Sequence, residues 1–314
     1  MAYNIKSIKK EFAEKGIFYT EPELANYLKS FLPDGVKEVY DPTCGNGGLL
    51  SVFDDDVEKY GQEINAEQLA DAEKHLKNFH GICGDTLKTP AWMDRKFDYI
   101  VANPPFGIKW EPPKMDMFDR DPRFESVPVL PSRGMADFAF MLHILYMLSD
   151  KGTAVVLDSL AINFRDNAEG KIRQWMLENN YIEKVIYIPE NQFVDTKIKT
   201  CIWVLSKHKE NNEIIFIDKK TGKQAVFTID DVRKKNFKLD ANSYFPQEKA
   251  PELPKLPVLL KQIHDDVGGQ LKAVVELTRQ LGNEDCFEIF IEEIQGILDN
   301  AKTYYGSIGE GISA

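Results

Sequence analysis

Short strand-like runs alternate with helical patterns along the chain, and this alternation constrains the fold more than any other feature. Strands are predicted from apolar and β-branched runs at Val36–Tyr40, Val57–Ile64, Phe97–Ala102, Thr153–Leu157, Val185–Ile188, Cys201–Leu205, Ile214–Ile217 and Ala225–Ile229. Helices are predicted from apolar residues at helical spacing at Ala66–Phe79, Ala136–Leu148 and Ala168–Asn179. This order predicts an α/β fold with a doubly wound, mostly parallel sheet.

A short helix is predicted ahead of the first strand. Thr20 is placed as its N-cap and Glu23 as the reciprocal partner of a capping box, and an apolar face follows at Leu24, Tyr27, Leu28 and Phe31. At the other helix, Ala66–Phe79, the stop signal is Gly81. We therefore expect residues 1–245 to form one catalytic domain that begins with a short helix.

The C-terminal part has a different pattern from this domain. A proline-punctuated linker is predicted from Pro246 to Pro257, and apolar stripes at helical spacing run from Val258 to Tyr305. These stripes could pack on the flank of the domain itself or dock a partner chain. Docking is favoured because the stripes are long and a linker precedes them, so residues 246–314 are predicted to be a helical tail for a partner.

Charge and composition exclude several classes of protein. The net charge of -11 is unusual for a protein that grips DNA alone, so it favours a partner that supplies phosphate contacts. The four cysteines lie far apart without CxxC spacing, and the five histidines are scattered, so no disulfide framework or metal site is expected. No secretory signal or membrane span is predicted, and we expect a cytoplasmic protein.

The segment Asn103-Pro104-Pro105-Phe106 follows the predicted strand Phe97–Ala102 directly. Such a segment can be a simple diproline turn that ends a strand. It can also activate an exocyclic amine of adenine, whose lone pair is delocalised into the ring, by accepting both N–H hydrogens. The Asn103 side chain and the Pro104 carbonyl offer two such acceptors, and Phe106 offers a face on which an extruded base can stack.

Three further segments fall at predicted strand ends. Asp41-Pro42-Thr43-Cys44-Gly45-Asn46-Gly47-Gly48 forms a glycine-rich turn, which lets backbone approach a ligand, although it lacks the GxGxxG of a dinucleotide fold. Glu63 ends the next strand, where an acid can bind a ribose diol, and Asp85 ends the third, where it can accept from an adenine amine. Each acid alone is more often a solvated side chain. Together they predict a nucleoside pocket.

A long stretch without periodicity runs from Gly107 to Gly134, and it carries five basic and five acidic residues. A loop of this length beside a catalytic motif can be a lid or a substrate contact, or a plain insertion. The sequence alone leaves both open.

Taken in order, these motifs resemble a known family. Gly16 to Thr20, Asp41 to Gly48, Gly61 to Asn65, Gly84 to Leu87, Asn103 to Phe106, Ala136 to Phe140 and Phe193 to Thr200 resemble the N6-adenine DNA methylases of the gamma motif order. Most closely, the chain looks like the modification subunit of type I restriction-modification systems, over about residues 10 to 230.

The resemblance implies roles that the spacing alone does not. S-adenosylmethionine would be the cofactor, with its methionine part held by Phe18, Tyr19, Thr20 and the turn from Asp41 to Gly48. Glu63 would hold the ribose, Asp85 the adenine, and Phe140 would line the adenine pocket or belong to the core. Phe193 would stack on the flipped base opposite Phe106, or be a core residue.

The partners that the resemblance implies are double-stranded DNA and a DNA-specificity subunit docked on the C-terminal helices, with a second copy of the chain as a third candidate. Where relatives carry Thr-Pro, this chain has Thr20-Glu21-Pro22, and where Pro-Asn or Pro-Gly is common after the fifth strand it has Asp158-Ser159. The same motif also serves RNA bases and a glutamine amide of proteins, and a non-catalytic binding subunit is the remaining alternative.

Overall fold

The computed structural model describes residues 20–112, 121–189, 199–245 and residue 276. The tail predicted for residues 246–314 therefore lies outside the described residues, apart from residue 276. The chain divides into two units, residues 1–246 and 247–314, and the first unit holds all of the described strands. No helix among the described residues is both long and apolar enough to cross a membrane.

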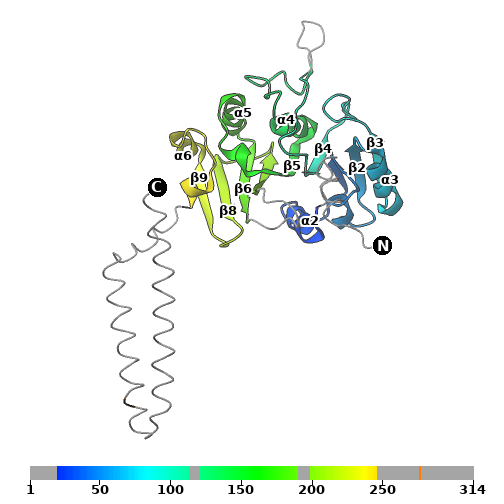
Figure 1. Cartoon of the computed structure of the whole chain (residues 1–314), viewed down its shortest axis with the longest axis horizontal. Coiled ribbons are helices and arrows are strands. Elements are labelled where there is room, and N and C mark those ends of the chain that lie inside the picture. The colour runs from blue at the N-terminus through cyan, green and yellow to red at the C-terminus, as the bar shows by residue number, and fades with distance from the viewer. Residues whose placement is uncertain (1–19, 113–120, 190–198, 246–275, 277–314) are drawn as a thin grey trace. The chain divides into compact units, whose positions relative to one another are not determined.

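The described strands form one nine-stranded sheet (Figure 1). Their order across it is β3 (Phe79–Cys83), β2 (Glu58–Glu63), β1 (Glu38–Asp41), β4 (Phe97–Ala102), β5 (Leu148–Ser159), β7 (Thr200–Ser206), β6 (Ile182–Ile188), β8 (Glu213–Asp218) and β9 (Gln224–Thr228). The pairs from β3 to β5 are parallel, and so is β6 with β8, whereas β7 runs antiparallel to both neighbours and β9 to β8. The predicted doubly wound, mostly parallel α/β sheet is confirmed.

Helices cover both faces of this sheet. The α-helices are α2 (Pro22–Lys29), α3 (Ala66–His75), α4 (Asp137–Met147), α5 (Asn167–Glu178), α6 (Ile229–Lys234) and α7 (Ala241–Tyr244). Alternate residues of one strand enter separate cores: Val101 of β4 joins the cluster that contains α2 and α3, and Ile100 joins the one with α4 and α5. This alternation explains why the central strands read as continuous apolar runs, since both of their faces are buried.

The chain leaves β1 towards one side of the sheet and continues from β4 towards the other. β1 and β4 are hydrogen-bonded neighbours, and the chain reaches β2 and β3 before it returns to β4. In open α/β sheets, the carboxyl ends of the strands at such a reversal form a crevice that binds ligands. The fold therefore places the ends of β1, β2 and β4 where a site is expected.

Two local predictions were wrong. The helix predicted for Ala66–Phe79 ends at His75, because Leu76 is extended and Asn78 takes a positive φ of 47°, and Phe79 already begins β3. The N-cap of α2 is Glu21, with no side-chain cap, so the capping box predicted at Thr20 does not form. Both errors concern where a helix begins or ends, which sequence patterns locate less well than the element itself.

Candidate active site

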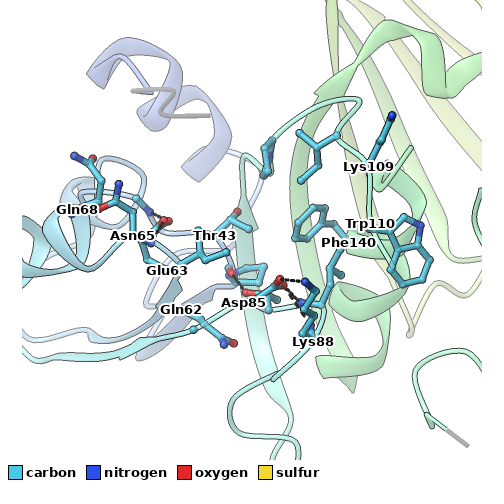
Figure 2. Close-up of a pocket in the computed structure, with 18 of the residues that line it drawn as sticks. Thr43, Gln62, Glu63, Asn65, Gln68, Asp85, Lys88, Lys109, Trp110 and Phe140 are labelled. Atoms are coloured by element: carbon cyan, nitrogen blue, oxygen red, sulfur yellow. Dashed lines mark hydrogen bonds and ion pairs between the residues drawn. The ribbon is translucent and has the colours of Figure 1, made fainter. Parts of the chain in front are cut away.

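A pocket of about 760 Å³ opens at the carboxyl ends of β1, β2 and β4. Glu63 and Asn65 lie on its β2 and α3 side, and Phe140 of α4 lies on the side formed by Trp110 and Lys109 (Figure 2). Asp85 lies between these two sides. The pocket therefore brings the predicted ribose, adenine and amine-binding segments into one cavity.

The glycine-rich turn after β1 is built from backbone hydrogen bonds. Asp41 accepts from the Thr43 amide at 2.9 Å, and the Gly47 amide donates to the Cys44 carbonyl at 2.7 Å. Gly47 has a φ of 84°, and a Cβ there would lie 2.6 Å from the Leu76 side chain. A side chain at this position would therefore strain the backbone and displace the Leu76 side chain, which explains the glycine here.

Glu63 holds the turn and the start of α3 together. One carboxylate oxygen accepts from the Gly45 amide at 2.9 Å, and the other accepts from the Asn65 amide at 2.8 Å. Asn65 then caps α3 by accepting from the Glu67 amide at 2.9 Å. Each carboxylate oxygen retains a second lone pair, so Glu63 can still accept from a vicinal diol in the pocket.

Asp85 is held in a tight turn two residues after β3. Its carboxylate accepts from the amides of Leu87 and Lys88, at 2.9 and 3.2 Å. The carbonyls of Thr86 and Leu87 accept in turn from the guanidinium of Arg123, at 2.9 and 2.7 Å. Arg123 comes from the long segment between Gly107 and Gly134, so this segment fixes the turn that carries Asp85.

The buried Arg123 also contacts His143 of α4, where Nη1 lies 3.3 Å from Nδ1 of the ring. Because arginine only donates, Nδ1 accepts, and the ring proton sits on Nε2, 3.2 Å from the Tyr40 hydroxyl. Burial, followed by the Arg123 charge, lowers the pKa of His143 well below its usual value. The histidine is therefore neutral, and it links Arg123 to Tyr40 in the core.

The four residues of the Asn103–Phe106 motif have different surroundings. Asn103 and Pro105 line the pocket, and Pro104 between them is buried. Phe106 is partly buried and packs against the core cluster that contains α2. The Asn103 side-chain nitrogen donates to the Thr20 hydroxyl at 3.0 Å.

A buried acidic cluster supports the chain just after this motif. Asp137 accepts from the Gly107 amide at 3.3 Å and forms an ion pair with Arg165 at 3.3 Å. Burial, together with the Asp137 charge, raises the pKa of Asp158 well above its usual value. Asp158, which stands where relatives commonly have a Pro-Asn or Pro-Gly pair, is thus a buried core residue and does not line the pocket.

The described parts of the long segment from Gly107 to Gly134 form one wall of the pocket. The Trp110 amide donates to the Arg133 carbonyl at 3.1 Å, and the Trp110 ring nitrogen donates to the Ser132 carbonyl at 2.8 Å. The Ala136 amide adds a further hydrogen bond by donating to the Ile108 carbonyl at 2.8 Å. The two ends of the segment are therefore hydrogen-bonded to each other beside the pocket.

The predicted site residues fall into three groups. Those that line the pocket are Thr43, Gly45, Glu63, Asp85, Asn103, Pro105 and Phe140. Those that shape or support it without lining it are Thr20, Asp41, Cys44, Asn46, Gly47, Gly48, Pro104 and Phe106. Phe18, Tyr19 and Phe193 lie outside the described residues.

The sequence patterns assigned no role to several residues that line the same pocket. These are Gln62, Ile64, Asn65, Gln68, Thr86, Leu87, Lys88, Ile108, Lys109, Trp110 and Arg133, with Gly84 and Glu111. Asn65 carried a local signal, since it precedes a helix as a cap residue. Trp110 carried none, because its place depends on pairing with residues more than twenty positions later. Among the described residues, no cluster of acids, histidines and cysteines could hold a metal ion.

Known proteins of one kind are similar to this chain. The chain is 33% identical over 230 residues to the type I restriction enzyme MpnII methylase subunit of Mycoplasma pneumoniae, which covers 65% of this chain and 42% of that protein. It is 30% identical over 250 residues to the HindI methylase subunit of Haemophilus influenzae, over 71% of this chain and 55% of the other. The chain thus spans about half the length of these relatives.

A solved structure and a family model match as well. The type I restriction-modification methyltransferase subunit of Streptococcus thermophilus superposes with a TM-score of 0.65 and 28% identity, over 72% of this chain and 59% of that one. The model of the N-6 DNA Methylase family matches residues 3–238, which include the whole pocket. The chain belongs to the N-6 DNA Methylase family.

Proposed function

We propose that this chain transfers a methyl group from S-adenosylmethionine to the N6 amine of adenine in DNA, as the modification subunit of a restriction-modification assembly. One observation carries the proposal: Asn103 lines the same cavity as Glu63 and Asp85. An amide acceptor for an amine therefore shares a pocket with two acids suited to a nucleoside.

The residues present fit the cofactor. A cavity of about 760 Å³ suits a ligand of this size. Glu63 would accept from the ribose hydroxyls, and Asp85 from the adenine amine, against the Phe140 ring. The turn at Thr43 and Gly45 would receive the methionine part. When bound, the cofactor supplies an activated methyl group.

Asn103 and the Pro104 carbonyl would accept the two N–H hydrogens of the target adenine. Accepting both hydrogens at positions out of the ring plane favours a pyramidal nitrogen, whose lone pair is no longer delocalised into the ring and can attack the methyl group. Both residues directly follow the buried strand β4, which supports the proposal that they need little reorganisation and that positioning provides most of the acceleration. Phe106 and Phe193 would stack on the extruded base.

The substrate class is tested by transfer of a tritiated methyl group to unmethylated genomic DNA, to RNA or to protein. We expect label in DNA, recovered as N6-methyladenine. Label in RNA or on a glutamine amide would replace the proposal with one of the two other substrates of such a motif. No binding of S-adenosylmethionine in a calorimetric titration would favour a non-catalytic subunit.

Asn103→Ala provides the matching test of the site. This variant loses an acceptor for the amine but no contact to the nucleoside acids, so transfer falls to background while cofactor affinity stays within about twofold. Asn212→Ala, at an exposed position just before β8, is the matched control and should leave transfer and cofactor affinity unchanged. If Asn103→Ala lost affinity and transfer together, Asn103 would be a structural residue.

The assembly is part of the proposal. Double-stranded DNA is the substrate, and a DNA-specificity subunit would dock on the helices predicted in residues 246–314. Deleting these residues is expected to abolish co-purification of the partner and to leave cofactor binding by the domain intact. A second copy of the chain is the other partner that this experiment would detect, by light scattering.

A further inference from the structure

The start of α4 holds the chain just after the Asn103–Phe106 motif by two hydrogen bonds. The Gly107 amide donates to the Asp137 carboxylate at 3.3 Å, and the Ala136 amide donates to the Ile108 carbonyl at 2.8 Å. Gly107 has a φ of 63°, a conformation that favours glycine. The two residues that follow the motif are therefore held by two neighbouring residues at the start of this helix.

The motif has few main-chain groups of its own that could hold it in place. The parallel pairing of β4 with β5 ends at Ala102, one residue before Asn103. Pro104 and Pro105 have no N–H, so neither can donate a hydrogen bond. The position of the motif therefore depends on the strand before it and on the hydrogen bonds directly after it.

Asp137 provides one of these hydrogen bonds without lining the pocket itself. Its side chain is buried, and the oxygen that accepts from Gly107 also forms an ion pair with Arg165 at 3.3 Å. Gly107 is exposed, so its amide could bond to water if folding alone were at stake. Phe140, three residues further along α4, lines the pocket, so one turn of this helix borders both the motif and the proposed adenine site.

We infer that Asp137 is a positioning residue: by holding the Gly107 amide at the start of α4, it fixes the two proposed amine acceptors relative to the cofactor pocket. The inference rests on the proposed function, and it adds a buried acid that touches neither substrate nor cofactor. The alternative is a purely structural role, in which Asp137 serves only as the partner of Arg165.

Asp137→Asn and Asp137→Leu separate these two roles in the full chain, purified together with the subunits that accompany it. Both variants remove the charge, and asparagine keeps an acceptor oxygen that leucine, of similar size, lacks. The orientation of the asparagine amide is defined, because the Gly107 amide and the Arg165 guanidinium face the same oxygen of Asp137 and can only donate. The Gly107 amide therefore keeps its partner only in the asparagine variant.

We expect the single-turnover rate of methyl transfer, at saturating cofactor and DNA, to be about tenfold lower in Asp137→Leu than in Asp137→Asn. This is the effect of losing one orienting hydrogen bond. The asparagine variant should stay within about threefold of wild type. The dissociation constant for S-adenosylmethionine, measured by titration calorimetry, should stay within about threefold in both variants, which also shows that they are folded.

A second background and a control complete the design. In an Arg165→Met background, neither variant leaves a guanidinium without its partner, and the same tenfold ratio of the two rates is expected there, to about a factor of two. Asp98→Leu is the matched control: it removes a partly buried carboxylate that accepts from Ser149 and Lys151 at the other end of β4, and both constants should match those of wild type.

Equal rates in the asparagine and leucine variants would overturn the inference, because the acceptor for Gly107 would then have no effect on transfer. A loss of cofactor affinity in Asp137→Leu as large as its loss of rate, in both backgrounds, would also overturn it, since Asp137 would then hold the pocket as a whole. Absence of adenine methylation by the wild-type protein would instead refute the proposed function, so the two failures are distinguishable.

Discussion

At the scale of single residues, the pocket is lined by side chains that also hydrogen-bond the backbone around it. Glu63 accepts from two main-chain amides, one in the turn after β1 and one at the start of α3, while it lines the pocket. A ligand hydroxyl in the proposed site would therefore meet a carboxylate whose position is already fixed. Glu63, which is predicted to bind the ribose diol, thus also joins the turn after β1 to the start of α3.

Glu63→Gln should weaken S-adenosylmethionine binding by at least about tenfold, since one oxygen becomes a donor that faces an amide N–H. Calorimetric titration measures the change. Glu67→Gln, on the exposed side of α3, is the control and should bind as wild type does. Equal affinity of the Glu63 variant and wild type would show that this acid does not contact the ligand.

Asp41 gives the protein a predictable response to pH. Burial raises the pKa of its carboxyl to about 7, against an ordinary value of 3.8. Between these two values the native state keeps a proton that the unfolded state loses. The protonated Asp41 carboxyl therefore makes its full contribution to the free energy of unfolding below about pH 4. This contribution falls as the pH rises towards 7, by up to about 1.4 kcal/mol per pH unit.

Asp41→Asn should remove this decline, because an amide does not titrate. Chemical unfolding of the wild-type chain and of this variant between pH 4 and 8 would measure it. The difference in unfolding free energy should grow in favour of the variant up to about pH 7 and stay constant above it. A constant difference across the whole range would contradict the raised pKa.

At the scale of elements, the described parts of the segment between Gly107 and Gly134 line the pocket and hold the turn that carries Asp85. Its Arg123 guanidinium, with a side chain only 1% exposed, bonds the carbonyls of Thr86 and Leu87 and an Asp121 carboxylate. The turn that presents Asp85 thus depends on a residue more than thirty positions away. The segment is therefore a part of the site and not a plain insertion.

Arg123→Met keeps the length of the side chain but leaves two buried carbonyls without a donor. We expect a loss of about 3 kcal/mol or more in unfolding free energy, and weaker cofactor binding as the Asp85 turn loosens. Arg233→Met, which breaks an exposed ion pair with Asp230, should change stability by less than about 1 kcal/mol. Similar losses in both variants would contradict the bracing role.

The sequence predicted the elements that carry local signals and failed where a contact is made in three dimensions. Asn103 and Glu63 were placed correctly because each follows or ends a strand with a clear apolar pattern. The end of α3 was missed because an apolar residue, Phe79, continues the helical spacing into a strand. The wall at Trp110 could not be predicted, since its two sides are joined only by tertiary pairing.

At the scale of the whole molecule, the chain is acidic, with a net charge of -11, so phosphate contacts with DNA would have to come from a local group of basic residues. Lys109 and Arg133 lie exposed at the pocket, and Lys220 and Lys223 lie in the turn after β8. β6 and β5 are both antiparallel to β7, and β8 is parallel to β6, so this turn is at the same sheet edge as the pocket. A duplex that presents an adenine would run along this edge.

Replacing either pair by alanine should reduce the steepness of the salt dependence of duplex binding by about 2 in the log–log slope, which corresponds to two lost phosphate contacts. Fluorescence anisotropy of the full chain with a labelled duplex measures this. Lys37 and Lys151, which precede or begin strands at the opposite edge, are the control pair and should leave the slope unchanged. A slope that moved equally with both edges would mean that binding is unspecific.

Trp110 pairs with Ser132 and Arg133, and the buried Arg123 holds the turn that carries Asp85. Lys109, beside Trp110, lines the same pocket with an exposed side chain. An engineer who wants to change what the cavity accepts can therefore exchange Lys109 and leave the residues that hold the wall in place untouched.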